Sequence, residues 1–318
     1  MSKIQEALRR IQQSGSKPAA QTRRKDDIAA AMRARPVRVA NLVEQEEFTV
    51  TEADFAANDR KLVFDQKALR DAGLIAPDYH IDLLSRQYRS IKRPLIGHAF
   101  GKRATKIEDG NLIMVTSALA GEGKTFTSIN LALSMAQERD HSVILVDADV
   151  AKPHVSNIFG VHEEPGLLDL LEDSQLDIGS LIMATDVDGL FIFPAGIPRL
   201  HATELLASSR MDRVTKALAR ITSDPIIIFD SPPLLQTSES SVVASLVGQI
   251  VLVVKAGQTS HDAVMSALAT IGDEKAINLV LNQVRDAGND NQYGYGYGYG
   301  YGYGKNFDGS ATTTVAPE

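Results

Sequence analysis

From residue 112 onwards, short apolar runs alternate with longer segments of helical periodicity, and this alternation constrains the fold more than any other feature. Such runs are typical of strands buried on both faces of a parallel sheet. Strands are expected at 112–116, 143–146, 190–193, 226–229, 250–254 and 277–281. Helices are expected at 124–137, 166–171, 203–220, 238–246 and 261–271. The pattern predicts one doubly wound, mostly parallel α/β domain, with its ligand site at the carboxyl ends of the strands.

A phosphate-binding loop is predicted where the first strand meets the first helix. The sequence there reads ALAGEGKT, from Ala118 to Thr125. Glycines let backbone N–H groups turn inward around phosphates, the lysine brings positive charge, and the threonine hydroxyl can bind Mg²⁺. A glycine-rich turn that binds no nucleotide is the alternative. The expected nucleotide-binding residues of this segment are Ala120, Gly121, Glu122, Gly123, Lys124, Thr125 and Phe126.

Three aspartates are expected at the ends of neighbouring strands. Asp147 and Asp149 follow the second strand, and Asp230 follows the fourth. Because the carboxyl ends of these strands meet at one edge of the sheet, the three carboxylates are expected to form a catalytic site with Lys124. Mg²⁺ takes oxygen ligands directly or through water, so Thr125, Asp149 and Asp230 are the expected metal ligands. The alternative for each aspartate is a strand-end cap.

Two further candidates follow the last expected strand, namely Asn282 and Arg285. An asparagine amide at that position could read the edge of an adenine through one donor and one acceptor. The arginine could stack on the same ring through its planar guanidinium group. A simple strand-end cap is the alternative for Asn282, so the sequence leaves its role open.

A run of alternating tyrosine and glycine lies near the C-terminus, within the expected tail 286–318. Glycine gives up the most backbone entropy on ordering, so the run is expected to stay exposed and mobile instead of entering a core. It therefore offers a row of phenolic hydroxyls to any active site that reaches it. An adhesive aromatic segment that only stacks or self-associates is the alternative. The tyrosines of the run are Tyr293, Tyr295, Tyr297, Tyr299, Tyr301 and Tyr303.

The N-terminal part of the chain differs from the remainder in charge. Residues 1–40 hold ten Lys or Arg against three Asp or Glu, and the remainder carries −14 within a total of −7. Residues 1–80 are therefore expected to form a flexible basic arm and linker with a possible short helix, ahead of a domain over 81–285. The acidity of that domain argues against nonspecific nucleic-acid binding.

The composition also indicates the cellular compartment in which the chain is expected. The chain has no cysteine, which excludes disulfides and thiolate metal sites and fits a reducing environment. No uninterrupted apolar stretch approaches the roughly 20 residues that a membrane-spanning helix needs. The N-terminal residues also lack the apolar region of a secretory signal. A cytoplasmic location is therefore expected, unless a partner carries the chain elsewhere.

Together, these motifs resemble those of the bacterial tyrosine kinases of exopolysaccharide systems. VTSALAGEGKT corresponds to the family's Walker A segment, ILVDADVAKP to its second Walker-type motif, and IIIFDSPP to its Walker B motif. The tyrosine-rich tail is a further likeness. Residues 85–95, SRQYRSIKRPL, most closely resemble the autokinases found beside exosortase loci. The resemblance covers residues 81–303 and implies a P-loop fold and Mg²⁺-dependent phosphorylation by ATP.

A helix is expected over 81–92, ended by Pro94. The family's self-assembly motif on this helix is usually Glu-x-x-Arg-x-x-Arg, whereas the corresponding residues here are Arg86, Arg89 and Lys92. The charge at the first position is reversed, so the ring-shaped homo-oligomer that the resemblance implies would use different pairing. A solvated basic helix face is the alternative. The resemblance also implies a separate transmembrane activator of polysaccharide chain length or export, a cognate tyrosine phosphatase and a peripheral place at the inner membrane.

The reaction that the resemblance implies is phosphorylation of the tail tyrosines, between neighbouring subunits. Asp147 or Asp149 is expected to accept the phenol proton, and Asp230 to hold a metal-bound water. One competing hypothesis is a partition or division-site ATPase switch of the same fold. Those ATPases usually carry an additional lysine early in the P-loop, which is absent from this sequence. The other is a noncatalytic nucleotide-bound scaffold for membrane machinery.

Overall fold

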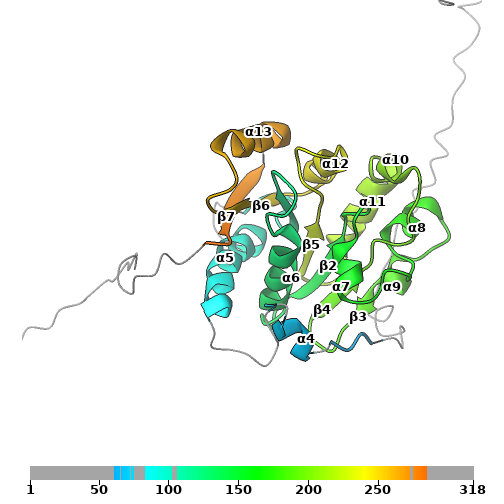
Figure 1. The fold of residues 1–318 in the computed structure, drawn as a ribbon. Helices are drawn as coiled ribbons and strands as arrows, with labels where there is room; N and C mark the ends of the chain where they lie inside the picture. Colours follow the sequence, from blue (N-terminus) through cyan, green and yellow to red (C-terminus); the bar gives the residue numbers. More distant parts are fainter. Residues whose placement is uncertain are drawn as a thin grey trace, which may run out of the picture. The chain divides into compact units, whose positions relative to one another are not determined.

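A seven-stranded sheet forms the centre of the computed structural model, which describes residues 61–64, 66–71, 73–74, 83–101, 106–272 and 275–284 (Figure 1). The strand order is β3-β4-β2-β5-β1-β6-β7, and all neighbours are parallel except β3 and β4. The predicted mostly parallel α/β fold is therefore confirmed. The strands are β1 Leu112–Ser117, β2 Ser142–Asp147, β3 Met183–Ala184, β4 Leu190–Phe193, β5 Pro225–Asp230, β6 Gln249–Lys255 and β7 Ala276–Asn282.

Helices cover both faces of this sheet, as Figure 1 shows. None of the helices in the described part of the chain is both long and apolar enough to cross a membrane. The helices are α4 Gln66–Asp71, α5 Leu83–Phe100, α6 Lys124–Met135, α7 His154–Ile158, α8 Leu167–Glu172, α9 Ile178–Leu181, α10 Ala202–Leu206, α11 Ser209–Leu218, α12 Glu239–Leu246 and α13 His261–Ile271.

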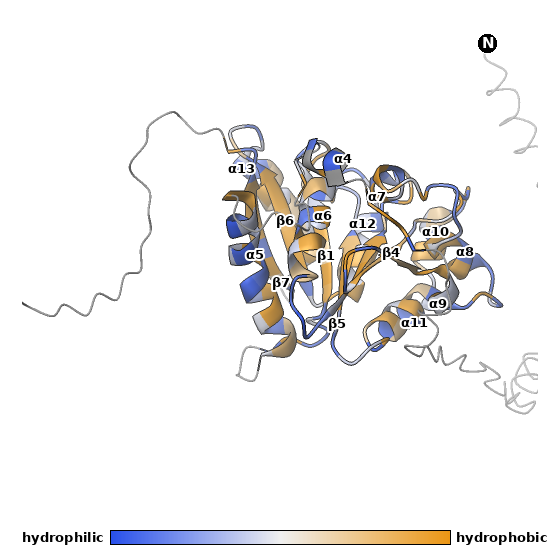
Figure 2. Cartoon of the chain, turned by 90° about the horizontal axis from the view of Figure 1, so that it is seen from below, coloured by the Kyte–Doolittle hydropathy of each residue, from blue (hydrophilic) through white to orange (hydrophobic). Residues whose placement is uncertain are grey.

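The central strands are apolar on both faces because each face packs against helices. In β1, Leu112 and Met114 belong to the core cluster shared with α8 to α13, whereas Ile113 and Val115 belong to the cluster shared with α5, α6 and α7. This division follows from the alternation of side chains along a strand. Figure 2 shows the apolar strands lying between helices that expose polar residues. Each of the six strands expected from sequence lies within one residue of its observed bounds.

The helix expected over 203–220 is two helices in the structure, α10 and α11. Ser208 lies between them in an extended conformation, and its side chain accepts a hydrogen bond from the N–H of Met211. Serine at this position caps α11, because its hydroxyl satisfies one of the amides at the start of a helix. The apolar periodicity across 203–220 conceals this break, so the expectation of one helix was wrong.

Helix α5 does not end before Pro94 but continues through it to Phe100. A proline inside a helix removes one backbone hydrogen bond and crowds the preceding turn. Here the apolar face on both sides of the proline outweighs that loss: Leu95 and Ala99 are buried beyond it, as is Tyr88 before it. The expected stop at Pro94 was wrong because tertiary packing against α6 overrides the local preference.

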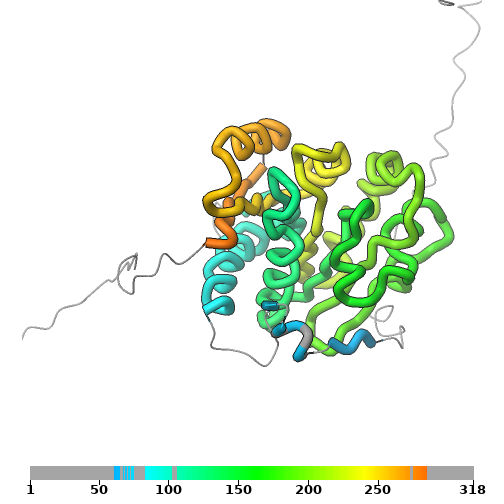
Figure 3. Tube along the Cα trace, viewed as in Figure 1, coloured from blue at the N-terminus to red at the C-terminus, as the bar shows by residue number. Residues whose placement is uncertain are grey.

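Part of the expected arm 1–80 packs against the sheet. Leu62 donates from its backbone N–H to the carbonyl of Ala184 at 2.8 Å, beside the edge strand β3. Phe64 stacks on Phe159 with ring centroids 4.7 Å apart. The trace in Figure 3 shows this blue segment beside the green strands. Residues 61–64 and 66–71 therefore belong with the domain, while residues 1–60 lie outside the described part of the chain.

Candidate functional site

The P-loop joins the end of β1 to the first residue of α6, Lys124, as the sequence predicts. Two of its glycines have left-handed backbones, with φ of +80° at Gly121 and +96° at Gly123. Only glycine adopts such angles without strain. A Cβ at Gly123 would also lie 2.0 Å from Nδ2 of Asn282, so any side chain at this position would force the Asn282 amide to move.

A cavity of about 250 Å³ opens at this edge of the sheet. Three loops line it: the P-loop with the start of α6, the loop after β2, and the loop after β5. Several residues expected to bind nucleotide or metal are among the lining, so the structure brings them together around one cavity. The described lining consists of Ala120, Gly121, Gly123, Lys124, Thr125, Phe126, Asp149, Ala151, Lys152, His154, Pro232, Pro233, Gln236 and Thr237.

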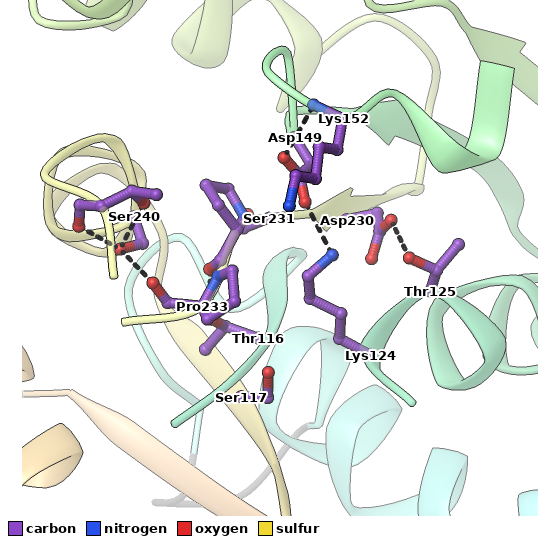
Figure 4. A network of polar contacts seen from close by, with 12 residues as sticks. Thr116, Ser117, Lys124, Thr125, Asp149, Lys152, Asp230, Ser231, Pro233 and Ser240 are labelled. Atoms are coloured by element: carbon purple, nitrogen blue, oxygen red, sulfur yellow. Dashed lines mark hydrogen bonds and ion pairs between the residues drawn. The ribbon is translucent and has the colours of Figure 1, made fainter. Parts of the chain in front are cut away.

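Lys124 and Asp149 form an ion pair in the wall of this cavity. Nζ of Lys124 lies 2.7 Å from Oδ2 of Asp149, and the two residues are only 8% and 3% exposed (Figure 4). The other oxygen of Asp149 accepts a hydrogen bond from the backbone N–H of Lys152 at 3.2 Å. Because the pair is nearly buried, water screens it little. The site thus holds a lysine ammonium group and a carboxylate in direct contact.

Asp230 joins the end of β5 to the first turn of α6. Its two oxygens accept hydrogen bonds from the hydroxyls of Thr125 and Ser128, each at 2.8 Å. Burial raises the pKa of Asp230, although the positive charge of Lys124 and the two hydroxyl bonds act in the opposite direction. Sequence reasoning missed Ser128. Ser128 lies three residues after Thr125, which places both hydroxyls on one helix face. This spacing is the sequence signal from which a contact of Ser128 with Asp230 could have been predicted.

Asp147 occupies a different environment from Asp149. Its Oδ2 accepts hydrogen bonds from the N–H and the hydroxyl of Ser156, both at 2.8 Å, which ties β2 to α7. Its Oδ1 is buried and has no hydrogen-bond partner among the described residues. Burial, with a smaller contribution from the charge of Asp230, raises the pKa of Asp147 to about 7. Unlike Asp149, Asp147 is not part of the described cavity lining.

Glu122 and Asn282 brace the P-loop from the side of β6 and β7. The buried carboxylate of Glu122 accepts hydrogen bonds from the N–H of Leu119 at 2.8 Å and from the hydroxyl of Thr259. Nδ2 of Asn282 donates to the carbonyl of Glu122 at 2.9 Å. Asn282 therefore lies against the loop, with its amide bonded to the loop backbone, and its expected contact with the edge of an adenine stays a prediction. Arg285, the other candidate for the adenine ring, lies outside the described residues.

The three basic residues of α5 that correspond to the family's self-assembly motif do not all lie on one face of the helix. Arg86 and Arg89 are exposed, but Lys92 is only 3% exposed. Its Nζ donates to the carbonyl of Ser134 at 2.5 Å and lies 2.7 Å from the carboxylate of Glu138. Lys92 shares the face of α5 that packs on α6, because it lies four residues after the buried Tyr88. Lys92 therefore does not belong to an exposed self-assembly motif with Arg86 and Arg89.

The predicted magnesium ligands are close to one another but do not form a closed metal cage. Among the described residues, no group of three or more acidic, histidine or cysteine side chains is arranged to hold a metal ion. The oxygens of Thr125, Asp149 and Asp230 are hard donors of the kind that Mg²⁺ prefers. They fit an ion whose remaining ligands come from nucleotide phosphates and water. The tail tyrosines 293–303 lie outside the described residues.

Known proteins resemble this chain in sequence. A family model described as an AAA domain matches residues 110–282. Tyrosine-protein kinase YwqD of Bacillus subtilis (strain 168) is 30% identical over 203 residues, which cover 63% of this chain and 81% of that protein. Tyrosine-protein kinase CpsD of Streptococcus agalactiae is 31% identical over 183 residues, which cover 57% of this chain and 78% of that protein.

Solved structures resemble it in fold. The kinase domain of Escherichia coli tyrosine kinase ETK is 25% identical with a TM-score of 0.55, and the match covers 75% of this chain and 87% of that one. The kinase domain of VpsO is 28% identical with a TM-score of 0.53, over 64% of this chain and 97% of that one. Both matches extend over most of the domain that carries the cavity.

Proposed function

Because this chain belongs to the bacterial tyrosine-protein kinases, we propose that it transfers the γ-phosphoryl group of ATP to the tyrosines of its own C-terminal run, residues 293–303. The observation that carries this proposal is the 2.7 Å contact between Lys124 and Asp149 in the cavity wall. It places a cation for the phosphates beside a carboxylate that can accept the proton of a phenol.

Nucleotide binding begins at the P-loop. Backbone N–H groups of the loop and the start of α6 receive the phosphate oxygens, favoured by the positive end of the helix dipole. Lys124 then exchanges its partner Asp149 for the β- and γ-phosphates. This exchange leaves the carboxylate of Asp149 available within the cavity, where an incoming tyrosine needs a base.

Bound Mg²⁺ would supply charge neutralisation at the β- and γ-phosphates, held by the hydroxyl of Thr125 and, through water, by Asp230. Asp230 also orients that hydroxyl, since it accepts a hydrogen bond from Thr125 and so directs the lone pairs of the Thr125 oxygen away from the carboxylate. Ser128 holds the second oxygen of Asp230 and so fixes the rotamer of the carboxylate. These contacts align the phosphoryl group without any covalent step by the protein.

Asp149 is the better candidate for the base. A tyrosine hydroxyl, with a pKa of about 10, is protonated at neutral pH and must lose its proton during transfer. Asp149 lines the cavity, whereas Asp147 is bonded twice to Ser156 and lies outside the described lining. We assign proton acceptance to Asp149 and the anchoring of α7 to Asp147.

The same proposal extends to regulation. Each phosphotyrosine adds about −1.5 to −2 charges, so six would add roughly −9 to −12 to an already acidic chain. We propose transfer between neighbouring copies, assembly that loosens as phosphate accumulates, and control of exopolysaccharide polymerisation or export through a transmembrane activator at the inner membrane. A cognate tyrosine phosphatase would reverse the modification. The likeness of residues 85–95 to exosortase-associated autokinases supports that setting.

The decisive experiment is incubation of the full chain with Mg²⁺ and ATP, alone and with membranes of its host, followed by mass spectrometry of the tail. Phosphorylation should add increments of about 80 Da on tyrosines 293–303, the mass of a phosphoryl group. Lys124→Met should show none. A wild-type chain that gains no phosphate under either condition, or a Lys124→Met chain that gains as much, would exclude the kinase function.

A mixing experiment tests transfer between copies. A Lys124→Met chain with an intact tail is combined with an active chain whose six tail tyrosines are phenylalanine. Phosphate on the Lys124→Met copy demonstrates transfer between copies. If that copy stays unmodified while wild type alone is phosphorylated, transfer occurs within one chain and this part of the proposal fails.

A further inference from the structure

Lys152 lies on the loop after β2, and hydrogen bonds hold its backbone on both sides. Its N–H donates to the carbonyl of Asp149 at 2.9 Å and to Oδ1 of the same residue at 3.2 Å, which closes a turn. Its carbonyl accepts from the N–H of His154 at 2.7 Å, across Pro153, which has φ −73° and ψ 76°. These angles form an inverse γ-turn, and the proline ring fixes φ. The base of the Lys152 side chain is therefore fixed beside Asp149.

The side chain of Lys152 lines the cavity, although the residue is exposed. Figure 4 shows it extending along Asp149 toward the side on which Lys124 lies. Within the described part of the chain, the ammonium group of Lys152 takes part in no ion pair, whereas that of Lys124 is paired with Asp149 at 2.7 Å. The described lining thus contains two lysines and one carboxylate, so one of its positive charges has no anionic partner.

The proposed reaction brings further negative charge to this place. When Lys124 moves to the phosphates, the carboxylate of Asp149 faces the γ-phosphoryl group without its cation. Both anionic groups must approach the same phenol oxygen, and their repulsion is strong where water screens it little. Lys152 is anchored to one oxygen of Asp149 while Lys124 is bonded to the other. Its flexible four-carbon stem can therefore bring a positive charge between the two anions.

We propose that Lys152 is a further catalytic residue, a second cation that binds oxygens of the γ-phosphoryl group and stabilises the transition state of its transfer. The inference rests on the proposed function, because it assigns a role in the same step. In that step the phenol oxygen forms a bond to the γ-phosphorus, and the bond from this phosphorus to the β,γ-bridging oxygen breaks with its electron pair passing to ADP. The phenol proton passes to Asp149. Lys152 exchanges no proton and contributes only charge.

The place of Lys152 in the fold gives it a different task from that of Lys124. Lys124 begins α6 and serves the phosphates of bound ATP on the side of the P-loop. Lys152 belongs to the same loop as the proposed base Asp149, where the phenol proton is accepted. During transfer the γ-phosphoryl group moves from ADP toward the phenol, and thus toward Lys152. The contact is therefore stronger in the transition state than in bound ATP, which raises kcat instead of the affinity for ATP.

Three variants of the full chain test this role: Lys152→Met, Lys152→Arg, which keeps the charge, and Lys216→Met as the matched control. Lys216 is an exposed lysine of α11 that is paired with Asp212 at 2.8 Å and lies outside the described cavity lining. Phosphorylation of an added tyrosine peptide gives kcat and KM. Calorimetry gives the dissociation constants of Mg²⁺-ATP and of Mg²⁺-ADP with aluminium fluoride, which mimics the phosphoryl group during transfer. Thermal unfolding checks the fold, and Lys152→Gln replaces Lys152→Met if that variant does not fold.

In Lys152→Met, kcat should fall about 10²- to 10³-fold, as for loss of one group that stabilises charge in a transition state. The complex with aluminium fluoride should weaken by a similar factor, while the dissociation constant of ATP changes less than about 3-fold. Lys152→Arg should recover most of both losses. Lys216→Met should behave like wild type in all of these measurements.

The assignment fails if Lys152→Met weakens ATP and the aluminium fluoride complex equally, because the contact would then be uniform binding. It also fails if neither kcat nor the aluminium fluoride complex changes. Equal impairment of Lys152→Arg and Lys152→Met would overturn it as well, since charge would then not be the property that matters.

The kinase function and the role of Lys152 fail separately. A wild-type chain that phosphorylates no tyrosine, but binds the aluminium fluoride complex more tightly than ATP, would exclude the kinase function. Loss of that tighter binding in Lys152→Met would still show that Lys152 acts on a phosphoryl group that passes to water. An active kinase that is unaffected by Lys152→Met would exclude only the role of Lys152.

Discussion

The hydroxyl of Thr125 donates a 2.8 Å hydrogen bond to Oδ2 of Asp230, and this contact joins the start of α6 to the end of β5. Ser128 donates to the second oxygen at the same distance. The carboxylate is thereby held in one orientation beside the phosphate-binding loop. A hydroxyl and a carboxylate in this arrangement are oxygen donors of the kind that Mg²⁺ prefers.

Asp230→Asn should weaken the binding of Mg²⁺ more than the binding of nucleotide. The amide can still accept from one hydroxyl, but it lacks the negative charge that favours a divalent cation. We expect the Mg²⁺ concentration for half-maximal autophosphorylation to rise at least about 10-fold and kcat to fall. A magnesium titration at saturating ATP measures both. Ser128→Ala, which keeps the charge, should change the magnesium requirement much less, and equal shifts in the two variants would refute the assignment.

Asp149 and Asp147 should differ sharply in their effect on catalysis. Asp149→Asn removes the carboxylate that lines the cavity, so kcat should fall by roughly 10²- to 10⁴-fold, as for loss of a general base. Asp147→Asn keeps an oxygen that can accept from Ser156 and should reduce kcat far less. Steady-state phosphorylation of an added tyrosine peptide, with KM for ATP measured in parallel, distinguishes them. A larger loss in Asp147→Asn would identify that residue as the base instead.

The pH dependence of stability offers an independent test of the buried Asp147. Its pKa is about 7 in the folded chain against an ordinary value of 3.8. Below pH 3.8 the carboxyl is protonated in both states and contributes nothing. Between 3.8 and about 7 only the unfolded chain ionises, so the folded state loses about 1.4 kcal/mol per pH unit, or roughly 4 kcal/mol in all.

Asp147→Asn removes that loss, since the amide does not titrate. The free energy of unfolding of the variant should therefore rise relative to wild type as pH increases from 4 to 7, and the difference should be constant above pH 7. Urea unfolding at several pH values measures it, in chelator and without nucleotide, so that bound metal does not obscure the carboxyl. A difference that is the same at pH 4 and pH 7 would show that Asp147 titrates normally.

Sequence reasoning located the site because its signals are local. A P-loop needs glycines, lysine and threonine in a fixed order after a strand. The amino-acid sequence alone therefore identifies Gly123, Lys124 and Thr125 as candidate P-loop residues. The strand-end aspartates followed from the alternation of strands and helices, since a parallel sheet brings the carboxyl ends of its strands to one edge. For Asp149 and Asp230, the structure gives direct contacts to Lys124 and Thr125.

The remaining features depend on packing between distant segments. The sequence predicts a basic helix face that includes Lys92, but the partners of Lys92 in its buried position, Ser134 and Glu138, lie more than 40 residues away. Strand β3 is two residues long and carries no periodic signal. Local preference cannot reveal such pairings, because the free energy that decides them comes from tertiary contacts.

The two left-handed glycines of the P-loop make a matched pair that separates backbone strain from steric conflict. At Gly121 the φ of +80° disfavours any side chain, but nothing lies within 4 Å of a Cβ built there. At Gly123 the φ is +96° and the same Cβ meets Nδ2 of Asn282 at 2.0 Å. Gly121→Ala therefore introduces strain alone, of about 1 kcal/mol, whereas Gly123→Ala adds a clash that forces the side-chain amide of Asn282 away from the loop.

ATP affinity should consequently fall modestly in Gly121→Ala, by about 5-fold, and fall further in Gly123→Ala, where the clash adds to the strain. Adding Asn282→Ala to Gly123→Ala removes the clashing amide, so calorimetry should show a partial recovery that stops at the level of Gly121→Ala, where strain remains. Asn282→Ala by itself provides the baseline for the lost bond to Glu122. If the second substitution restores nothing, the clash does not govern this position, and the close approach of Asn282 is not what requires glycine there.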